Sequence, residues 1–390
     1  MRKVVVLLLA VMLMAGLLAA CGQQDAAAPT PTQEQTEETA PAVEEDEDEE
    51  DDDDEQATAI APPADVGEFN PDDADGMDFY DMRAALGAVP APTEAIELGA
   101  VAKAFANEYW RTLREGYIQA QDTLREMGHD VTITVSSALT EDDEQGQLSI
   151  VMDMIARNLD GLLLSPISDG NLVPGVEQAL AAGIPVINVN DGLIANAPWF
   201  VGPRAVENGW LAAEWINDQL NGEGEVAIIM GMPRAFAARQ RTLGFEQWMA
   251  ENAPGITIIE NQNADWDRSR ARDLAETWIN QHPDLVAIFA NNDTMALGAV
   301  EAVQASGRDI LVVGVDGIGE AYDSIRAGGL SATVDSFPFF KSQIAVEAML
   351  RAMNGQDLAR VIWTPQALID TTNVDVPAAE IINWQDVPFS

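Results

Sequence analysis

Polar and aromatic side chains in this 390-residue chain gather directly behind short apolar runs, at the places where strands would end. Carboxylates, amides and guanidinium groups supply the fixed donors and acceptors that neighbouring hydroxyls need, and aromatic rings supply flat faces for the C–H side of a saturated ring. Together they suit a neutral, polyhydroxylated small molecule. The residues that we assign to ligand binding on this ground are Lys103, Asn107, Tyr109, Trp110, Asn190, Asp191, Arg241, Trp266, Asn292 and Asp316.

Alternating strands and helices would bring these side chains together. Apolar runs predict strands at 96–102, 131–135, 161–165 and 184–189, and again at 225–230, 256–260, 285–290 and 310–315. Amphipathic stretches predict helices at 109–127, 141–157, 239–252, 268–281 and 294–306. This alternation is typical of parallel sheets covered by helices, and ligands bind at the carboxyl edge of such a sheet. Because one sheet with this many strands would be unusually wide, we expect two similar α/β lobes.

The N-terminal segment has the pattern of a secretory signal. Arg2 and Lys3 precede an apolar stretch that is short for a membrane span, and small residues lead to Cys21, the single cysteine of the chain. This arrangement resembles a bacterial lipobox, in which the cysteine is acylated. We therefore expect residues 1–20 to be a lipoprotein signal peptide and Cys21 to anchor an extracytoplasmic protein by lipid. The alternative is an ordinary signal peptide with an incidental cysteine.

The formal net charge of −45 is concentrated in the next segment. Residues 22–82 contain no lysine or arginine, and an unbroken acidic block runs over 44–55. Such a composition offers little apolar surface, and its like charges repel, so we expect an acidic disordered tether over 21–93. An acidic chain repels phosphates, which argues against binding of nucleic acid. The remaining residues are numerous enough for two domains.

A more specific pattern lies in the second half of the chain. The stretches Ala290 to Ala299 and Val312 to Gly317, together with Asn107 to Trp110, resemble the type I periplasmic sugar-binding proteins of ABC transporters, of the ribose-binding kind. The resemblance covers about residues 94 to 355. It implies two doubly wound parallel-sheet lobes joined by a three-stranded hinge near Pro203, Gly317 and Phe337. The lobes would comprise 94–203 plus 337–367 at the N-terminal side, and 204–336 plus 368–390 as the C-terminal lobe and tail.

The same resemblance implies roles for single residues. Asn292 and Asp316 would bind sugar hydroxyls, Arg241 would be a sugar-binding arginine, and Arg239 would be more structural. Tyr109, Trp110 and Trp266 would enclose the ring between aromatic side chains of opposite lobes.

Two departures from the family pattern bear on the ligand. The chain has Asn190-Asp191 where the family has an Asp-Arg pair, and Ser336 where it has a glutamine near the hinge. With Lys103, these substitutions suggest a pentose other than ribose, a hexose, a polyol or a cyclitol. We assign Ser336 to ligand binding together with the residues named above. This chain also has Glu108 where the family has proline.

Helix capping offers a structural alternative for some of these residues. Asn292 and Asp293 both precede a predicted helix, where Asn and Asp commonly satisfy the first amide groups. We assign the cap to Asp293 and ligand contact to Asn292.

Enzymatic functions are disfavoured. The chain has no nucleophile elbow, no phosphate-binding loop, no complete dinucleotide fingerprint, and only two histidines for a metal site. We therefore expect a monomeric binding protein without a cofactor, which captures a sugar or polyol and passes it to ABC permease subunits. A receptor that presents the sugar to a membrane kinase or chemoreceptor is the alternative. A sugar-responsive repressor is disfavoured by the lipobox and by the missing helix-turn-helix.

Overall fold

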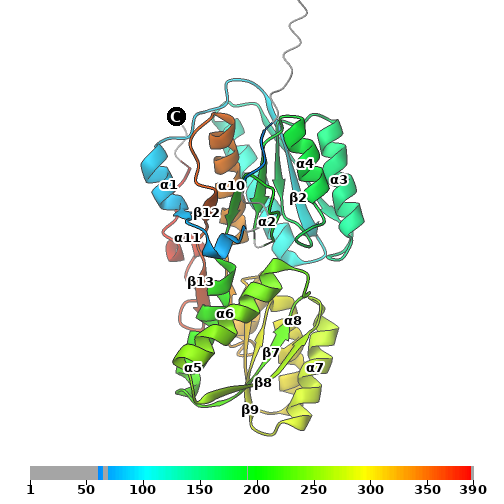
Figure 1. Cartoon of the computed structure of the whole chain (residues 1–390). Helices are drawn as coiled ribbons and strands as arrows, with labels where there is room; N and C mark the ends of the chain where they lie inside the picture. The colour runs from blue at the N-terminus through cyan, green and yellow to red at the C-terminus, as the bar shows by residue number, and fades with distance from the viewer. Residues whose placement is uncertain (1–59, 65–68, 191, 388–390) are drawn as a thin grey trace, which may run out of the picture. The chain divides into compact units, whose positions relative to one another are not determined.

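The computed structural model describes residues 60–64, 69–190 and 192–387, which belong to one compact unit. Two α/β lobes are visible within it, each built on its own sheet (Figure 1). The predicted signal peptide, Cys21, Asp191 and the acidic block lie outside the described residues. Within the described ranges, no helix combines the length and the apolar character needed to span a bilayer.

The N-terminal lobe is a parallel sheet with the strand order β1-β12-β6-β5-β4-β2-β3. Helices α2 (Glu108–Glu126) and α10 (Pro338–Met353) pack together on one face, and α3 (Glu144–Ala156) and α4 (Val173–Ala181) cover the other (Figure 1). The strands are β1 (Met77–Asp78), β2 (Ile96–Ala104), β3 (Val131–Ala138), β4 (Gly161–Leu164), β5 (Val186–Val189), β6 (Trp199–Gly202) and β12 (Val361–Trp363).

The C-terminal lobe has the strand order β13-β11-β10-β9-β7-β8, in which only β13 runs antiparallel to its neighbour. Helices α5 (Ala205–Leu220) and α6 (Phe236–Asn252) cover one face, α7 (Arg268–Gln281) and α8 (Asp293–Ser306) the other, and α9 (Gly319–Arg326) follows β10. The strands are β7 (Gly224–Met230), β8 (Ile256–Asn263), β9 (Leu285–Ala290), β10 (Leu311–Asp316), β11 (Ala332–Asp335) and β13 (Ala367–Asp370).

Residue patterns explain these elements. β4 and β5 are buried at every position, as expected for strands covered by helices on both faces. Helix α2 buries Leu113, Tyr117 and Leu124, which recur at the spacing of one helix face. Gly116 lies on the same face, where a Cβ would stand only 2.0 Å from the carbonyl oxygen of Phe339. The missing side chain therefore lets α2 and α10 approach closely.

Three crossings connect the lobes. They follow β6, β11 and β12, at residues 203–204, 336–337 and 364–366. Pro203 and Phe337 lie at crossings, but the prediction for Gly317 is wrong. Gly317 has a φ of 75° and turns the chain from β10 into α9 within the C-terminal lobe. The third crossing lies instead at 364–366, between β12 and β13.

The predicted tether extends too far. Residues 69–89, here called the strap, form a short 3₁₀ turn (Pro71–Asp73), β1 and α1 (Phe79–Leu86) on the N-terminal lobe. Phe79 and Met82 are almost completely buried in its core. The prediction was based on the acidic composition of the whole segment and gave no weight to these apolar residues. Their burial offsets the conformational entropy that is lost when the chain is ordered.

The strap also reaches the other lobe. The carboxylate of Asp72 accepts hydrogen bonds from the backbone amides of Ala205 (2.8 Å) and Val206 (3.1 Å), at the start of α5. Helix α5 has no side-chain cap of its own, so Asp72 supplies one from far away in the sequence. Burial raises the pKa of Asp72 to about 7.

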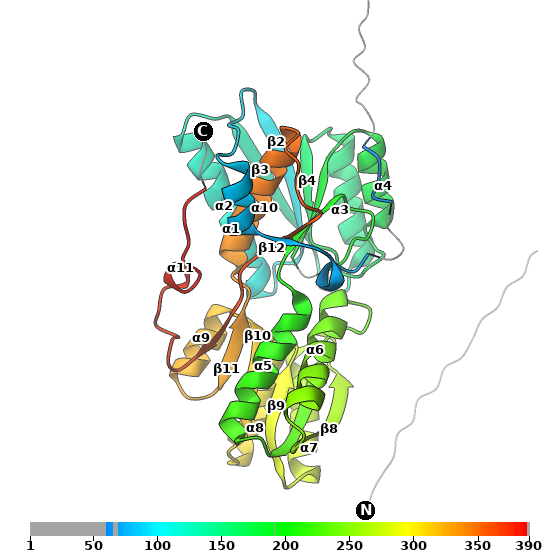
Figure 2. The ribbon, with the colours of Figure 1, turned by 60° about the vertical axis from the view of Figure 1, so that its left-hand side comes forward.

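The end of the chain differs from the prediction as well. Residues 371–387, here called the tail, include α11 (Ala378–Ile381) and run along the side of the molecule from one lobe to the other (Figure 2). Arg326 of α9 forms an ion pair with Asp375 of the tail at 2.9 Å. Tyr80 of α1 then donates to the carbonyl of Ile382, and Trp384 packs on Phe340. The tail, which was grouped with the C-terminal lobe without a predicted packing partner, thus ends on the N-terminal lobe at residues 382–387.

The buried position of Phe79 allows a test of the strap. Replacing Phe79 by Ala removes a ring with no exposed surface, and should lower the free energy of unfolding by about 3–5 kcal/mol. Urea unfolding of the full chain measures this change. The exposed neighbour Asp81→Ala should change stability by about 0.5 kcal/mol or less. Equal, small effects of both substitutions would show that the strap is not part of the folded core.

Candidate functional site

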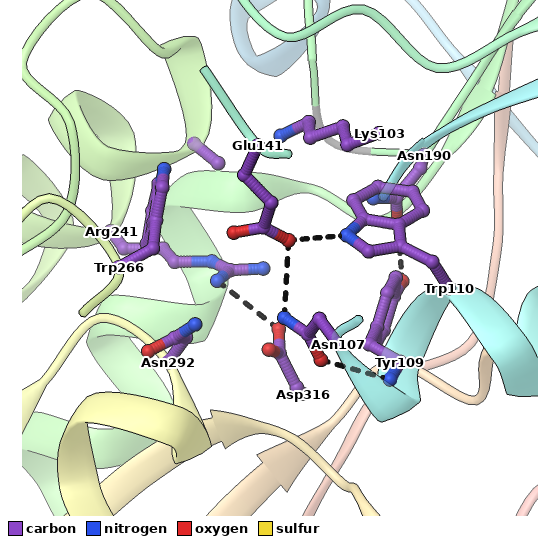
Figure 3. Close-up of a pocket in the computed structure, with 11 residues that line it drawn as sticks. Lys103, Asn107, Tyr109, Trp110, Glu141, Asn190, Arg241, Trp266, Asn292 and Asp316 are labelled. Atoms are coloured by element: carbon purple, nitrogen blue, oxygen red, sulfur yellow. Dashed lines mark hydrogen bonds and ion pairs between the residues drawn. The ribbon is translucent and has the colours of Figure 1, made fainter. Parts of the chain in front are cut away.

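A cavity lies where the carboxyl edges of the two sheets meet (Figure 3). The space there that is not filled by atoms amounts to about 310 Å³, part of which is open to solvent. Both lobes contribute walls. The lining residues are Lys103, Asn107, Tyr109, Trp110, Glu141 and Asn190 from the N-terminal lobe, and Ala237, Arg241, Trp266, Asn292 and Asp316 from the C-terminal lobe.

The start of α2 forms one wall. The side-chain oxygen of Asn107 caps the helix by accepting from the amide of Tyr109 at 3.0 Å. Its amide nitrogen donates to Oε1 of Glu141 at 3.2 Å, and the indole nitrogen of Trp110 donates to the same oxygen at 2.6 Å. One carboxylate oxygen thus fixes both an amide and an indole that line the cavity (Figure 3).

Glu141 was not among the predicted site residues. Glu141 was predicted to be the first residue of a helix over 141–157. In the structure, α3 begins at Glu144, and Asp143 is its cap. Glu141 instead lies in the loop behind β3, which ends at Ala138. The other site residues were selected because they are polar and directly follow a predicted strand. Glu141 meets the same criterion when the helix is placed at its actual start, Glu144.

A buried network supports Tyr109 from behind. The ammonium of Lys341 donates to the Tyr109 hydroxyl at 2.7 Å, to Oδ1 of Asn190 at 2.6 Å and to Oγ of Ser336 at 3.1 Å. Ser336 has no exposed surface and does not line the cavity. Ser336 therefore lies behind the cavity lining, and its short side chain bonds to Lys341 at the hinge.

Arg241 and Asp316 form the polar part of the opposite wall. Both are nearly buried, with Nη1 of Arg241 3.4 Å from Oδ1 of Asp316 and 2.6 Å from the carbonyl oxygen of Asn291. Burial strengthens such charge-assisted bonds and holds the guanidinium in one orientation.

The start of α8 reverses one expectation. Asn292 caps the helix, with Oδ1 accepting from the amide of Met295 at 2.9 Å, and also lines the cavity. Asp293 is not the cap. Its carboxylate accepts from the amides of Gly317 (2.8 Å) and Ile318 (3.0 Å) and from the hydroxyl of Thr333 (2.7 Å). Asp293 therefore holds the loop that directly follows Asp316.

Trp266 supplies an apolar face. A Cβ on Gly231 would lie 2.1 Å from its indole, so only glycine leaves room for the ring. Trp266 has a φ of 66°, which is strained for a bulky residue, and Asn190 (76°) and Asp316 (131°) also have positive φ. Strain of this kind persists where surrounding structure enforces it, commonly at binding sites.

Lys103 lies between the aromatic rings. Its ammonium is 5.2 Å from the ring centre of Trp110 and 6.0 Å from that of Trp266, within the reach of cation–π attraction. The side chains from the two lobes thus face each other across Lys103.

The cavity brings together most of the residues that were expected to bind ligand. Of that set, Ser336 lies behind it and Asp191 is outside the described residues. Arg239, expected to be more structural, forms an ion pair with Asp169 across the lobes. Among the described residues, no group of His, Cys, Asp and Glu side chains is arranged to hold a metal ion.

Comparison with known proteins finds relatives over most of the folded region. The sequence pattern of the periplasmic binding protein domain family matches residues 98–357. The chain is 34% identical to the D-ribose/D-allose-binding protein of Pseudomonas aeruginosa, over 73% of this chain and 92% of the relative. It is 35% identical to the ribose import binding protein of Bacillus subtilis, over 58% of this chain and 74% of the relative.

Solved structures show the same arrangement. An ABC transporter periplasmic solute-binding protein from Actinobacillus succinogenes with bound D-allose matches with a TM-score of 0.67 at 28% identity, over 72% of this chain and 99% of that one. A solute-binding protein from Bacillus halodurans with bound myo-inositol matches with a TM-score of 0.66 at 28% identity, over 73% and 97%.

The buried position of Asp293 predicts a pH dependence. Burial raises its pKa from 3.8 to about 6. Such an acid holds its proton more tightly in the folded chain than in the unfolded one. Its contribution to the free energy of unfolding therefore grows as the pH falls through about 6 and is lost as the pH rises. Between pH 7 and pH 5 the gain is about 1 kcal/mol.

Urea unfolding of the full chain at these two pH values tests this. The change from pH 7 to pH 5 should be about 1 kcal/mol more favourable to folding in the wild type than in Asp293→Asn. The exposed Asp309→Asn serves as a control and should behave like the wild type. An identical pH response of Asp293→Asn and the wild type would contradict the assignment.

Proposed function

Because the chain belongs to the periplasmic binding protein domain family, we propose that it captures a neutral sugar or polyol between its lobes and delivers it to an ABC importer. The observation that carries this proposal is the cavity itself, in which indoles and polar groups from both lobes converge. The relatives include ribose- and allose-binding proteins, and solved neighbours hold D-allose or myo-inositol. The family consists of solute-binding transport proteins, which are not enzymes and act outside the cytoplasm.

The charges in the lining favour an uncharged ligand. Lys103 and Arg241 bring two cations, and Glu141 and Asp316 bring two carboxylates. A sugar acid would meet the carboxylates and an amino sugar would meet the cations in a site of low dielectric constant. Hydroxyls, which donate and accept, suit both kinds of group.

Contacts at the rim of the cavity support capture by closure of the lobes. The carboxylate of Glu108 accepts from the amide of Gly319, at the start of α9, at 3.1 Å. Arg234 of the C-terminal lobe pairs with Glu144 at 2.7 Å. Asp169 accepts from the amide of Phe236 at 3.1 Å, beside its ion pair with Arg239. These contacts join the two lobes around the ligand cavity and exclude water from it.

The remaining expectations complete the proposal. Cys21 carries a lipid that anchors the protein outside the cytoplasm, and the acidic residues before the strap act as a tether. The protein works as a monomer, and its closed form is the one that permease subunits recognise. The lipobox pattern and the acidic composition support the first two points.

A panel of sugars tests the function. The full chain is screened by thermal shift with D-ribose, D-allose and myo-inositol, with D-glucuronate and D-glucosamine as charged comparisons. We expect at least one neutral compound, and neither charged one, to raise the melting temperature. For that compound, Trp266→Ala and Asp316→Ala should each weaken affinity in calorimetry by more than about tenfold, through lost stacking and a lost buried acceptor.

Trp210→Ala is the matched control, because this tryptophan lies on α5, is 36% exposed and does not line the cavity. It should bind like the wild type. Unchanged affinity in both cavity variants would show that the ligand binds elsewhere.

The rim contact of Glu108 gives a second test. Glu108→Ala removes the acceptor for the first amide of α9 without altering the cavity lining. Because only closure is weakened, affinity should fall about two- to fivefold, mostly through faster dissociation. Stopped-flow release of the bound sugar measures this. The exposed Glu115→Ala on the same helix should release at the wild-type rate, and an equal rate for Glu108→Ala would contradict the role in closure.

A further inference from the structure

We propose that Lys341 is a positioning residue, which fixes two side chains of the cavity wall and links them to the hinge without touching the ligand. The inference rests on the proposed function and deepens it. Lys341 lies on α10, has no exposed surface and does not line the cavity. Its side chain nevertheless bonds to residues that do.

The ammonium of Lys341 contacts oxygen atoms from three separate parts of the chain. It donates to the Tyr109 hydroxyl, to Oδ1 of Asn190 and to Oγ of Ser336, at 2.7, 2.6 and 3.1 Å. The Tyr109 hydroxyl also donates to Oδ1 of Asn190 at 2.5 Å (Figure 3). Because an ammonium can only donate, it requires an acceptor in each of these directions. The amide of Asn190 therefore keeps its oxygen turned toward Lys341.

This arrangement sets the shape of the cavity wall. Tyr109 and Asn190 both line the cavity, and the Tyr109 ring packs edge-on against Trp110, with the ring centres 5.0 Å apart. The oxygen and nitrogen of an amide differ little in size, so hydrogen-bond partners decide which way each of them points. Loss of the ammonium would let the amide of Asn190 rotate and would weaken the support of the Tyr109 ring.

The same ammonium reaches the second crossing between the lobes. Ser336 is the first residue of that crossing, and Phe337 beside it has a φ of 48°, which is strained for a bulky residue. Asp335, at the end of β11, accepts from the amide of Phe337 at 2.6 Å. The crossing is thus held by Asp335 on one side and by Lys341 on the other. A change in the angle between the lobes must change backbone dihedrals at such a crossing.

Asn190 connects the network to the first crossing. Its backbone amide donates to the carbonyl of Val201 at 2.9 Å, and a Cβ on Gly202 would lie only 2.2 Å from its carbonyl oxygen. Pro203 and the first crossing follow directly. Through Asn190 and Ser336, Lys341 therefore links the cavity wall to two of the three crossings.

The other buried charges of α10 have a different arrangement. Glu347 lies 2.9 Å from Arg83 and 2.8 Å from Arg351, so these opposite charges compensate each other. They join α10 to the strap, and none of them lines the cavity. Burial of a lysine is costly, and the oxygens that accept from Lys341 belong to neutral side chains at the cavity and the hinge. Arg351 is therefore a matched control for Lys341.

Calorimetry on the full chain tests the inference. The probe is the neutral compound that binds best among D-ribose, D-allose and myo-inositol. Lys341→Met keeps an apolar side chain of similar length but removes the donors, and should weaken affinity by more than about tenfold. Arg351→Met removes an equally buried cation from the same helix. Both substitutions should lower the free energy of unfolding in urea, but Arg351→Met should change affinity by less than about twofold.

A mutant cycle separates positioning from a general loosening of the fold. Tyr109→Phe combined with Asn190→Gly removes the two groups that Lys341 positions, and glycine accepts the φ of 76° found at Asn190. In this background, Lys341→Met should weaken affinity by less than about threefold. Titration of tryptophan fluorescence measures the weak binding of these variants. An equal loss in both backgrounds would overturn the inference.

A measurement without ligand addresses the position of Asn190 directly. Its side-chain amide resonances in the ¹⁵N-labelled full chain, assigned through Asn190→Gly, should shift in Lys341→Met and stay in place in Arg351→Met. If Lys341→Met does not fold, Ser336→Ala replaces it, because this substitution removes one acceptor outside the cavity lining. Ser336→Ala should shift the same resonances and weaken affinity about two- to fivefold.

The outcomes distinguish this inference from the proposed function. Wild-type affinity in Lys341→Met, or in Ser336→Ala where that variant takes its place, would overturn the inference, and so would amide resonances of Asn190 that do not respond. Failure of the wild type to bind any of the three compounds would count against the proposed function instead. The resonances of Asn190 would then still decide whether Lys341 fixes the amide.

Discussion

The carboxyl ends of the parallel strands of the two sheets face each other across the cavity, where a buried polar group without a hydrogen-bond partner is costly. This constraint explains the dense hydrogen bonding around the cavity. Asn107 uses its side chain both to cap α2 and to reach Glu141. Asn292 caps α8 while lining the cavity. Residues that satisfy their own helix first are held rigidly, and rigid groups lose little entropy when a ligand binds.

The sequence predicted the lobes and most of the cavity, because strand ends are marked by apolar runs and polar residues follow them. Its errors have physical causes. Glu141 was lost through a helix start misplaced by three residues, and helix ends are weakly encoded. Asn292 and Asp293 are both good caps, and only the backbone shows that Asn292 has the extended conformation of a cap. Ser336 depends on Lys341, a partner whose proximity no local pattern reveals.

The strap and the tail are the least predictable parts, and both lie outside the residues that match the family. The prediction for the strap used the average composition of its segment, which is acidic. It therefore did not identify Phe79 and Met82 as core residues. In the structure it becomes an edge of one sheet and, through Asp72, the cap of a helix in the other lobe. The tail adds another connection, from Arg326 to Tyr80. The contacts of the strap and of the tail connect the lobes in addition to the three crossings. Motion of one lobe relative to the other must therefore either keep these contacts or break them.

The small free energies of the contacts between the lobes at the cavity rim indicate why closure of the lobes should depend on bound ligand. The contacts of Glu108, Glu144 and Asp169 are partly exposed, and pairs of this kind contribute about 0.5–1 kcal/mol each. Their sum, about 1.5–3 kcal/mol, is well below the roughly 5.5 kcal/mol needed to turn a mostly open population into a mostly closed one. Under the proposed function, the difference comes from a ligand in the cavity, which would cover the indoles of Trp110 and Trp266 and contact polar groups of both lobes. Rim contacts of this strength change the affinity for ligand by a small factor. Ligand binding itself is what shifts the population from open to closed.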